Sequence, residues 1–429
     1  TVYHPHFTIP KADGVSFRHI INMKLGNRHV QHTHFKMEGL QQLKCLVSQN
    51  CWAVKVDIKS AFTHIPIHKK VRDFFRIRWK ERHLRFRAMP FGYKDAPRIF
   101  TMVMRAALKP LRQKGLKLVA YLDDIILVAE TETLALLQGQ LLIDHLHKLG
   151  FNLSKEKCSP APSKVVDFLG FTLDLGSLRI SVPTKKARSM RQEASSLARK
   201  LEPINAVRLA SLLGKFRATS AAVKPALLQS RHLQWELRKA GWPRKRNGVV
   251  PLSDQARAEL LWWHHHLCTW TGTFMFAPTP TWILTTDASS SGWGGWLATA
   301  DDPKTAVATA YGFWESQAQK RRRHPNRWSS NRREMTATLR SIQFFSQTLQ
   351  NSSFLIRTDN KANLANLLKG GGSSPDLTLI AKEVWSLCDS LSAVFSVKYV
   401  PGEDNDLADH LSRLKWDRSD WKLNPELFR

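Results

Sequence analysis

The alternation of hydrophobic and polar positions predicts a hairpin of buried strands in the first half of the chain. Apolar runs at residues 118–120 and 125–128 flank the stretch Tyr121–Asp124. Two apolar runs separated by a short polar segment are typical of two paired strands joined by a tight turn. We therefore expect Asp123 and Asp124 to lie at the tip of this hairpin.

Strands and helices alternate around this hairpin. Residues 54–58 alternate between apolar and polar side chains and predict a strand with Asp57 near its end. Cations alternate with apolar residues over 75–87, which predicts a half-buried strand pair with a positively charged exposed face. Apolar residues recur at helical spacing over 96–108 and 134–149, so we expect two amphipathic helices there.

The second half of the chain changes pattern twice. Residues 184–275 are basic, and the spacing of their apolar residues predicts mainly helices. Strand-like segments then follow at 281–287 and 354–360, and helical spacing returns at 332–345 and 407–413. Strand-like and helix-like segments that occur together in one region predict a sheet covered by helices. The fold class predicted for the whole chain is α+β.

Composition narrows the class of protein. The chain has 429 residues, which suggests two to four domains, and 43% hydrophobic residues, which is ample for packed cores. Its formal net charge of +30 points to a polyanionic partner, and nucleic acid is the first candidate because phosphate contacts release counterions. Five scattered cysteines indicate a reducing compartment. We see neither an apolar membrane span nor a signal peptide, so we expect an intracellular protein, in the nucleus or the cytoplasm, without a membrane partner.

The acidic pair at the hairpin tip suggests metal chemistry. Adjacent carboxylates between buried strands repel each other and are costly to desolvate. A divalent cation removes that cost, and carboxylate oxygens suit Mg²⁺. Asp57 could meet Asp123 and Asp124 and complete a site for two Mg²⁺ ions, which would activate a 3′-hydroxyl and stabilise a leaving pyrophosphate. A solvated acidic turn is the alternative for an Asp-Asp pair taken alone.

Four motifs in order resemble those of retroelement reverse transcriptases. They are Asp57 with Phe62, the run Met89–Pro97, the run Tyr121–Asp124 and the run Phe168–Phe171. The resemblance implies a right-hand polymerase of fingers, palm and thumb. Its implied catalytic metal ligands are Asp57, Asp123 and Asp124.

The same resemblance implies roles for further residues. Lys11 and Arg18 would grip the incoming triphosphate, and Phe62 would act as a steric gate against a ribose 2′-hydroxyl. Phe91 would lie near the nascent base pair, and Tyr121 would contact substrate. The primer grip would consist of Phe168, Leu169 and Gly170. The alternatives are that Lys11 and Arg18 are ordinary surface cations and that Phe62 is a core residue.

A second acidic set follows downstream. Asp287 and Asp359 end the two predicted strands, Glu334 lies near the start of a predicted helix, and Asp409 lies in the last helical segment. Carboxylates in such places can converge on one face of a mixed sheet and hold two Mg²⁺ ions that activate water against a phosphodiester. The order Asp, Glu, Asp, Asp resembles ribonuclease H, which implies that all four are catalytic metal ligands. Mn²⁺ could replace Mg²⁺ at either site.

These resemblances predict the domain organisation. We expect fingers and palm over residues 1–183, a helical thumb or connection over 184–275, an α/β ribonuclease H-like domain with a mixed sheet over 276–415, and a tail over 416–429. The implied partners are an RNA template, a DNA primer, the RNA-DNA hybrid and dNTPs.

The implied function is reverse transcription coupled to removal of the RNA template, in the replication of a retrotransposon. The runs Lys369–Leu377, Glu383–Cys388 and Asp420–Phe428 look most like those of DIRS-like retrotransposons, whereas Pro401–Arg413 is shared with gypsy-like long-terminal-repeat elements, the second choice. Because the chain begins at Thr1 without Met, we expect a segment of a polyprotein. Two other classes stay open, namely a domesticated, catalytically silent nucleic-acid-binding protein and a structural subunit of undetermined oligomeric state.

Overall fold

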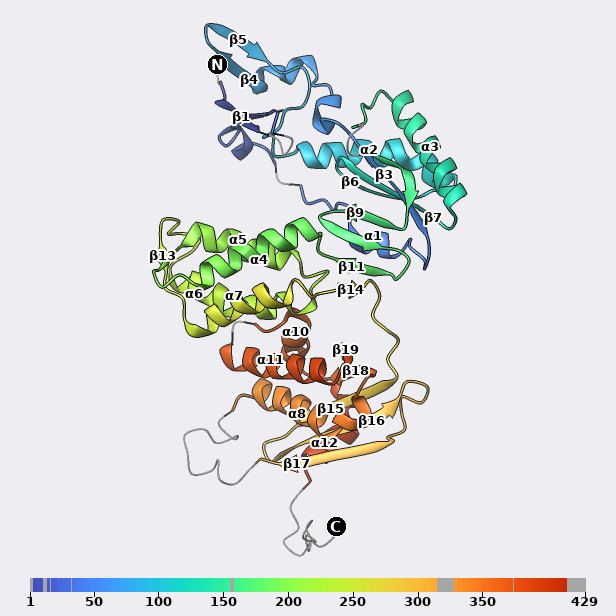
Figure 1. The fold of residues 1–429 in the computed structure, drawn as a ribbon, viewed down its shortest axis with the longest axis vertical. Helices are drawn as coiled ribbons and strands as arrows, with labels where there is room; N and C mark the ends of the chain where they lie inside the picture. Colours follow the sequence, from blue (N-terminus) through green and yellow to red (C-terminus); the bar gives the residue numbers. More distant parts are fainter. Residues whose placement is uncertain are drawn as a thin grey trace, which may run out of the picture. The chain divides into compact units, whose positions relative to one another are not determined.

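A computed structural model gives the fold of the chain (Figure 1). It describes residues 3–10, 14, 15, 17–31, 33–154, 158–314, 328–372 and 374–414. Lys11 and the predicted tail at 416–429 lie outside the described residues. The chain divides into two compact units, one formed by residues 1–183 with 274–276 and the other by residues 184–273 with 277–429.

The centre of the first unit is an antiparallel sheet of order β6-β7-β3-β8. Its strands are β3 (Trp52–Asp57), β6 (Lys117–Tyr121), β7 (Asp124–Ala129) and β8 (Ser159–Ser163). Alternate residues of these strands, such as Val56 and Leu127, share a core with Phe100 of helix α2 (Ala96–Gln113) and Leu142 of helix α3 (Glu132–Lys148). Because strand side chains alternate between faces, Asp57 lies on the face opposite these helices.

Two hairpins and a smaller sheet complete the first unit. Strand β1 (His6–Pro10) pairs with β2 (Phe17–Ile21), and β4 (Arg76–Trp79) pairs with β5 (Arg82–Arg85), which confirms the strand pair predicted from alternating cations. A short helix α1 (Leu40–Lys44) precedes β3. The smaller sheet has the order β14-β11-β10-β9, with strands β9 (Val165–Phe168), β10 (Phe171–Asp174), β11 (Arg179–Ser181) and β14 (Thr273–Phe274).

The second unit begins with helices, as its sequence predicts. These are α4 (Thr184–Ala198), α5 (Ala206–Ala218), α6 (Arg231–Lys239) and α7 (Asp254–His266), with a two-stranded ribbon of β12 (Ile204–Asn205) and β13 (Val249–Val250). The sequence separates this region from the ribonuclease H-like part, but the structure groups the two into one compact unit. The reason is direct packing, since Leu228 belongs to the same hydrophobic core as Leu284 and Met335.

A mixed five-stranded sheet of order β17-β16-β15-β18-β19 forms the rest of this unit. Strands β15, β16 and β17 pair antiparallel, and β15, β18 and β19 pair parallel, which confirms the predicted mixed sheet. The strands are β15 (Trp282–Ala288), β16 (Gly292–Thr299), β17 (Ala308–Phe313), β18 (Ser353–Thr358) and β19 (Val394–Tyr399).

Helices pack on both faces of this mixed sheet. On one face, the core joins the sheet to residues of α8 (Ser330–Phe344), α10 (Lys361–Lys369) and α11 (Pro375–Ser390). A short helix, α9 (Ser346–Leu349), directly follows α8. On the other face, Ala408 and Leu411 of α12 (Asp406–Ser412) pack against Ile283 and Trp296.

A glycine in β16 permits the close approach of α12. A Cβ atom on Gly294 would lie 2.6 Å from the Ala408 carbonyl oxygen and 2.6 Å from the Ser412 backbone nitrogen. Both are backbone atoms of α12, so the helix would have to move to admit a methyl group. The helix carries Asp409, and this glycine therefore also bears on the second acidic site.

We expect Gly294→Ala to destabilise the second unit by about 1–3 kcal/mol, the usual cost of overpacking a core. The matched control is Gly214→Ala, since Gly214 lies in α5 with no atom within 4 Å of an added Cβ. That control should gain up to about 1 kcal/mol, because glycine is unfavourable inside a helix. Calorimetric unfolding of the two variants checks the prediction, and equal stabilities would contradict it.

Candidate active sites

The predicted acidic hairpin forms in the first unit. Tyr121 of β6 pairs with Asp124 of β7, and Leu122 between them adopts the left-handed conformation, with φ +54°. On the other side of β7, Asp57 is the register partner of Asp124. The Ile58 backbone nitrogen donates to the Asp123 carbonyl oxygen at 2.9 Å. Strand pairing therefore brings all three predicted polymerase carboxylates to one end of the sheet.

A groove of about 700 Å³ opens over these carboxylates. Asp57 is buried, whereas Asp124 forms an ion pair with Lys55 at 3.3 Å. Asp167 of β9 also lines the groove, so four carboxylates share it with one lysine. Among the described residues, the carboxylate oxygens of Asp57, Asp123 and Asp124 do not all lie within 4.8 Å of one another. Lys55 and Asp167 were not predicted as site residues; the alternation that places Lys55 on the face of Asp57 could have indicated it.

Arg18, Phe91 and Phe62 contact one another in series. The Arg18 guanidinium carbon lies 5.0 Å from the centre of the Phe91 ring, and the Phe91 and Phe62 ring centres are 5.0 Å apart. The Phe62 ring also contacts the fully buried Phe100, with centres 5.9 Å apart. Phe62 is therefore partly exposed but supported by the core of the unit.

A glycine turn fixes Phe91 against the β1–β2 hairpin. Gly92 has φ +108°, and a Cβ atom there would lie only 1.9 Å from the Ile21 carbonyl oxygen. The Ile21 backbone nitrogen donates to the Phe91 carbonyl oxygen at 3.0 Å. The Asn27 side chain donates to the Gly92 carbonyl oxygen and accepts from the Lys94 backbone nitrogen, each at 2.9 Å. Asn27 is a supporting residue that the sequence patterns do not single out.

The predicted primer grip is a tight turn between β9 and β10. Phe168 pairs with Phe171, and the two residues between them, Leu169 and Gly170, have φ +50° and +77°. Positive φ at both central positions suits the right-handed twist of a hairpin. The Phe168 side chain is fully buried, so it cannot contact a primer and instead anchors the turn. Only Leu169 and Gly170 reach the surface.

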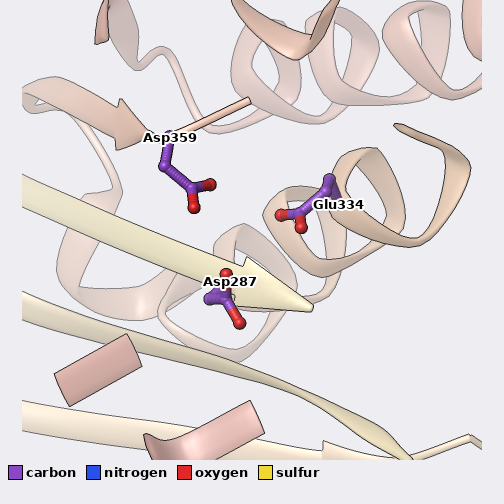
Figure 2. Close-up of side chains that lie close together, drawn as sticks. All are labelled: Asp287, Glu334 and Asp359. Carbon is purple, nitrogen blue, oxygen red and sulfur yellow. The ribbon is translucent and has the colours of Figure 1, made fainter. Parts of the chain in front are cut away.

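The second acidic site is a compact cluster of three carboxylates. Figure 2 shows Asp287, Glu334 and Asp359 turned toward a common space. One carboxylate oxygen from each lies within 4.8 Å of the other two. Asp287 lies near the end of β15, Asp359 follows the neighbouring parallel strand β18, and Glu334 projects from α8. Because parallel strands end at the same edge of a sheet, two carboxylates meet there and the helix adds the third.

Asp409, the fourth predicted ligand, lies near this cluster but outside it. Both of its carboxylate oxygens accept from Arg413 Nε at 2.8 Å. Burial raises the pKa of both Asp287 and Asp359, and the nearby charge of Asp409 adds to that effect. The structure thus joins three of the four predicted residues directly, and an arginine one helical turn away holds the fourth.

Two neighbours that were not predicted as site residues orient Asp287. The Ser412 hydroxyl donates to Asp287 Oδ2 at 2.8 Å, and the Asn405 side-chain amide donates to Asp287 Oδ1 at 3.4 Å. Both residues are buried at the two ends of α12. They belong to the same run that carries Asp409, but only the folded helix brings them to the end of β15.

Burial makes the three carboxylates unfavourable as free anions. Glu334 is 6% exposed, and burial, with the nearby charges of Asp287 and Asp359, raises its pKa to about 9. Burial also raises the pKa of Asp287 and of Asp359. Glu334 Oε2 is buried without a hydrogen-bond partner. Three oxygen donors around one space, one of them unsatisfied, fit a divalent cation that prefers oxygen ligands.

Comparison with known proteins defines the class. Residues 9–173 match the family described as reverse transcriptase (RNA-dependent DNA polymerase), and residues 277–379 match the RNase H-like domain found in reverse transcriptase. The chain therefore contains one region similar to a reverse transcriptase domain and a second region similar to an RNase H-like domain. The first match contains the acidic hairpin and the second contains Asp287, Glu334 and Asp359, whereas Asp409 lies beyond it.

Curated relatives are viral polyproteins. The chain is 26% identical to the enzymatic polyprotein of cauliflower mosaic virus (strain NY8153) over 406 residues, which cover 92% of this chain and 55% of that protein. The enzymatic polyprotein of figwort mosaic virus (strain DxS) is also 26% identical, with the same coverage. The genome polyprotein of petunia vein clearing virus (isolate Shepherd) is 24% identical, over 17% of its length. The chain thus spans about half the length of the first of these relatives.

Solved structures share the fold. The foamy viral protease-reverse transcriptase in complex with RNA/DNA hybrid has a TM-score of 0.57 and 15% identity, covering 98% of this chain and 52% of that one. A foamy viral protease-reverse transcriptase in complex with dsDNA has a TM-score of 0.56 and 16% identity, covering 93% and 77%. The described helices include none with the length and apolar character needed to cross a bilayer.

The raised pKa of Glu334 predicts a pH-dependent stability in metal-free buffer. Between the ordinary glutamate pKa of 4.5 and about 9, the native state keeps a proton that the unfolded chain has lost. Stability should therefore fall as pH rises through this window. Glu334→Gln cannot lose that proton, so its Tm in EDTA should fall less steeply from pH 5 to pH 9.

A divalent cation should reverse this effect. Mg²⁺ should raise the Tm of the wild type at pH 8, because a ligand that binds only the native state stabilises it, and should raise that of Glu334→Gln by less. Calorimetry with and without EDTA measures both effects. Equal pH slopes for the two proteins would contradict the assignment of Glu334 as a protonated, metal-accepting group.

Proposed function

We propose that the protein is an RNA-directed DNA polymerase that also copies DNA and that cleaves the RNA strand of RNA-DNA hybrids. The observation that carries this proposal is the presence of two separate acidic sites, each at the sheet edge of its own domain. Both domains match the families named above. A polymerase that makes a hybrid and a nuclease that removes its RNA together convert an RNA template into DNA.

At the polymerase site, Asp57, Asp123 and Asp124 would hold two Mg²⁺ ions. The ions would supply Lewis-acid activation of the primer 3′-hydroxyl and charge stabilisation for the leaving pyrophosphate. The chain would supply position, since Asp57 and Asp124 are fixed as register partners. Lys55, which pairs with Asp124, would have to release that carboxylate when a metal binds it.

Around this site, the chain would orient the incoming dNTP. The Phe62 ring, supported by Phe100 and Phe91, would exclude a 2′-hydroxyl by its bulk. Arg18, which lies over the Phe91 ring, would reach the triphosphate together with Lys11. Tyr121, at the end of β6, would contact the substrate from the palm. The turn at Leu169 and Gly170 would bring backbone against the primer end.

At the ribonuclease H site, Asp287, Glu334 and Asp359 would hold Mg²⁺, with Asp409 as a further ligand. The ions would activate water for attack on the RNA phosphodiester. Ser412 and Asn405 would keep the Asp287 carboxylate aimed at the metal by donating to its two oxygens. Mn²⁺ has the same preference for oxygen ligands and could act at both sites.

The charge of the protein supports an RNA template, a DNA primer and their hybrid as partners. The net charge of +30 would attract phosphate backbones. The β4–β5 hairpin presents Arg78 and Arg82 at its exposed end. Two of the similar solved structures are complexes with dsDNA and with RNA/DNA hybrid.

The catalytically silent binding protein is the second candidate. Its support is the same positive charge, which would bind nucleic acid without chemistry. Burial of Asp287, Glu334 and Asp359 without a cation is energetically unfavourable. This cost favours an active enzyme over a silent binding protein, because a protein without catalysis would gain nothing from it. We further propose a DIRS-like retroelement as the source, on the sequence of the runs 369–377, 383–388 and 420–428, with a gypsy-like element as the alternative.

Primer extension on an RNA template tests the proposal. With template and primer labelled separately, dNTPs and Mg²⁺ should give an extended primer and a shortened template on one gel. Extension with an intact template would remove the ribonuclease H assignment. Tight hybrid binding without either activity would favour the silent binding protein.

Asp123→Asn should separate the two activities. Loss of a metal ligand at the hairpin should lower the rate of DNA synthesis by more than about 100-fold. The reason is that stabilisation of transition-state charge by a bound metal is worth several kcal/mol. Cleavage of a preformed hybrid should stay at the wild-type rate. The control is Asp144→Asn, an exposed aspartate on α3, which should change neither rate. Parallel loss of both activities in Asp123→Asn would contradict two independent sites.

Phe62→Ala should relax sugar selection. Removal of the ring should raise the efficiency of ribonucleotide incorporation relative to deoxynucleotide incorporation by at least about tenfold, since rejection here depends on a steric clash and not on a hydrogen bond. Phe62→Tyr keeps the bulk and should keep the selectivity. Single-nucleotide extension with dNTP and rNTP measures the ratio, and an unchanged ratio in Phe62→Ala would end the steric-gate assignment.

A further inference from the structure

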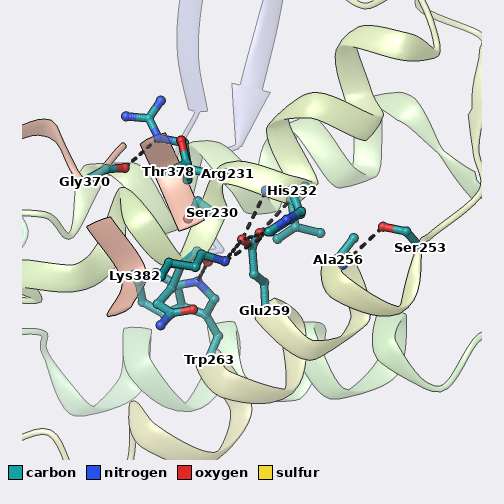
Figure 3. Close-up of polar contacts among 12 residues, drawn as sticks. Ser230, Arg231, His232, Ser253, Ala256, Glu259, Trp263, Gly370, Thr378 and Lys382 are labelled. Atoms are coloured by element: carbon teal, nitrogen blue, oxygen red, sulfur yellow. Dashed lines mark hydrogen bonds and ion pairs between the residues drawn. The ribbon is translucent and has the colours of Figure 1, made fainter. Parts of the chain in front are cut away.

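An arginine from the preceding helical segment holds the far end of the helix that follows Asp359. Figure 3 shows Arg231, the first residue of α6, beside Gly370. Arg231 Nε donates to the Gly370 carbonyl oxygen at 2.7 Å, and Nη2 donates to the carbonyl oxygens of Lys369 at 2.7 Å and Gly371 at 2.6 Å. Lys369 is the last residue of α10, and Gly370 and Gly371 directly follow it, so these carbonyls lie at the negative pole of the helix. One guanidinium group therefore binds three successive carbonyl oxygens at the C-terminal end of α10.

A buried carboxylate fixes the position of this arginine. Glu259 of α7 is 2% exposed and accepts from the backbone nitrogens of His232 and Leu233, each at 3.1 Å, in the first turn of α6. It also accepts from Lys382 of α11 at 2.8 Å (Figure 3). Burial opposes its ionisation, but the hydrogen bond from His232 and the charge of Lys382 outweigh burial and lower its pKa. The start of α6 is thus tied to two other helices.

Close packing leaves little freedom at this contact. A Cβ atom on Gly370 would lie 2.8 Å from the Leu228 backbone nitrogen, and Gly370 itself has φ +58°. Leu228 is fully buried in the core of the RNase H-like domain. The end of α10 therefore rests on the backbone that leads into Arg231, with no room for a side chain between them.

The other end of α10 belongs to the acidic site. Asn360, the residue after Asp359, caps α10 by accepting from the backbone nitrogens of Ala362 and Asn363 at 2.9 and 3.0 Å. Its amide also donates to Asn331 Oδ1 at 3.0 Å, on the helix that carries Glu334. Nine residues of helix, about 13 Å, separate these contacts from the arginine. A short helix is stiff, so a shift at one end moves the other.

We propose that Arg231 is a positioning residue for hybrid cleavage, one that keeps Asp359 in place by holding α10 at its opposite end. The inference rests on the proposed ribonuclease H function and adds to it a dependence on the helical segment before the domain. Metal-dependent hydrolysis requires its ligands at nearly fixed positions, so a small displacement of Asp359 would weaken metal binding and slow the chemical step. Binding of the hybrid would not change, because Arg231 donates to backbone carbonyls.

The test compares Arg231→Ala with the wild type in the full chain. Arg231→Ala should lower kcat for cleavage of a preformed hybrid by about 10- to 100-fold, the cost of a displacement near 1 Å. It should raise the Mg²⁺ concentration needed for half-maximal cleavage and leave KM for the hybrid within about twofold of the wild type. Primer extension in the same chain should be unchanged. The control is Arg238→Ala, which removes the same charge from an exposed position of the same helix. This variant should cleave the hybrid at the wild-type rate.

Guanidinium ion added at low millimolar concentration provides a second readout. It should restore part of the cleavage by Arg231→Ala, because it can donate to the same carbonyls, and should not affect Arg238→Ala. Normal cleavage by Arg231→Ala, a change in KM alone, or a loss of cleavage that guanidinium does not restore would each overturn the proposal. Absence of cleavage in the wild type would instead refute the proposed ribonuclease H function, so the two failures are distinguishable.

Discussion

The mutual repulsion of closely placed carboxylates is the constraint on which both candidate sites depend. At the RNase H-like site, burial, together with the nearby charges of Asp287 and Asp359, raises the pKa of Glu334 to about 9. No arrangement of the surrounding apolar core removes this cost, whereas a divalent cation does, because its charge compensates the anions at short range. The fold therefore keeps an unfavourable interaction at a place where a divalent cation would relieve it.

The two sites manage the same repulsion differently. In the hairpin groove, Lys55 neutralises Asp124 directly, and the three polymerase carboxylates do not gather within 4.8 Å. In the RNase H-like domain, Arg413 holds Asp409 at the margin, and the other three carboxylates stay together. An internal cation thus already pairs with one carboxylate at each site, and a metal would have to compete with that cation for the carboxylate.

Support for the sites comes from residues that carry no chemistry themselves. Asn27 fixes the turn that presents Phe91, the buried Phe168 anchors the exposed turn after β9, and Ser412 aims Asp287. Arg231 extends the same principle over a whole helix. These contacts join segments far apart in the sequence, so their energies are gained only when each domain is fully packed.

Local patterns in the sequence determined the strands that end at or next to Asp57, Asp287 and Asp359, the acidic hairpin and the basic strand pair. The period of apolar residues and the residues of tight turns are local properties, so they can be read from the sequence. Only the tertiary structure decided which carboxylates meet. Asp409 pairs with Arg413 in the next turn of its helix and stays outside the cluster of three carboxylates. Lys55 of β3 pairs with Asp124 of the neighbouring strand β7. The contact of Arg231 with α10 links residues nearly 140 positions apart. Such contacts depend on how elements pack in space, and no local period encodes that packing.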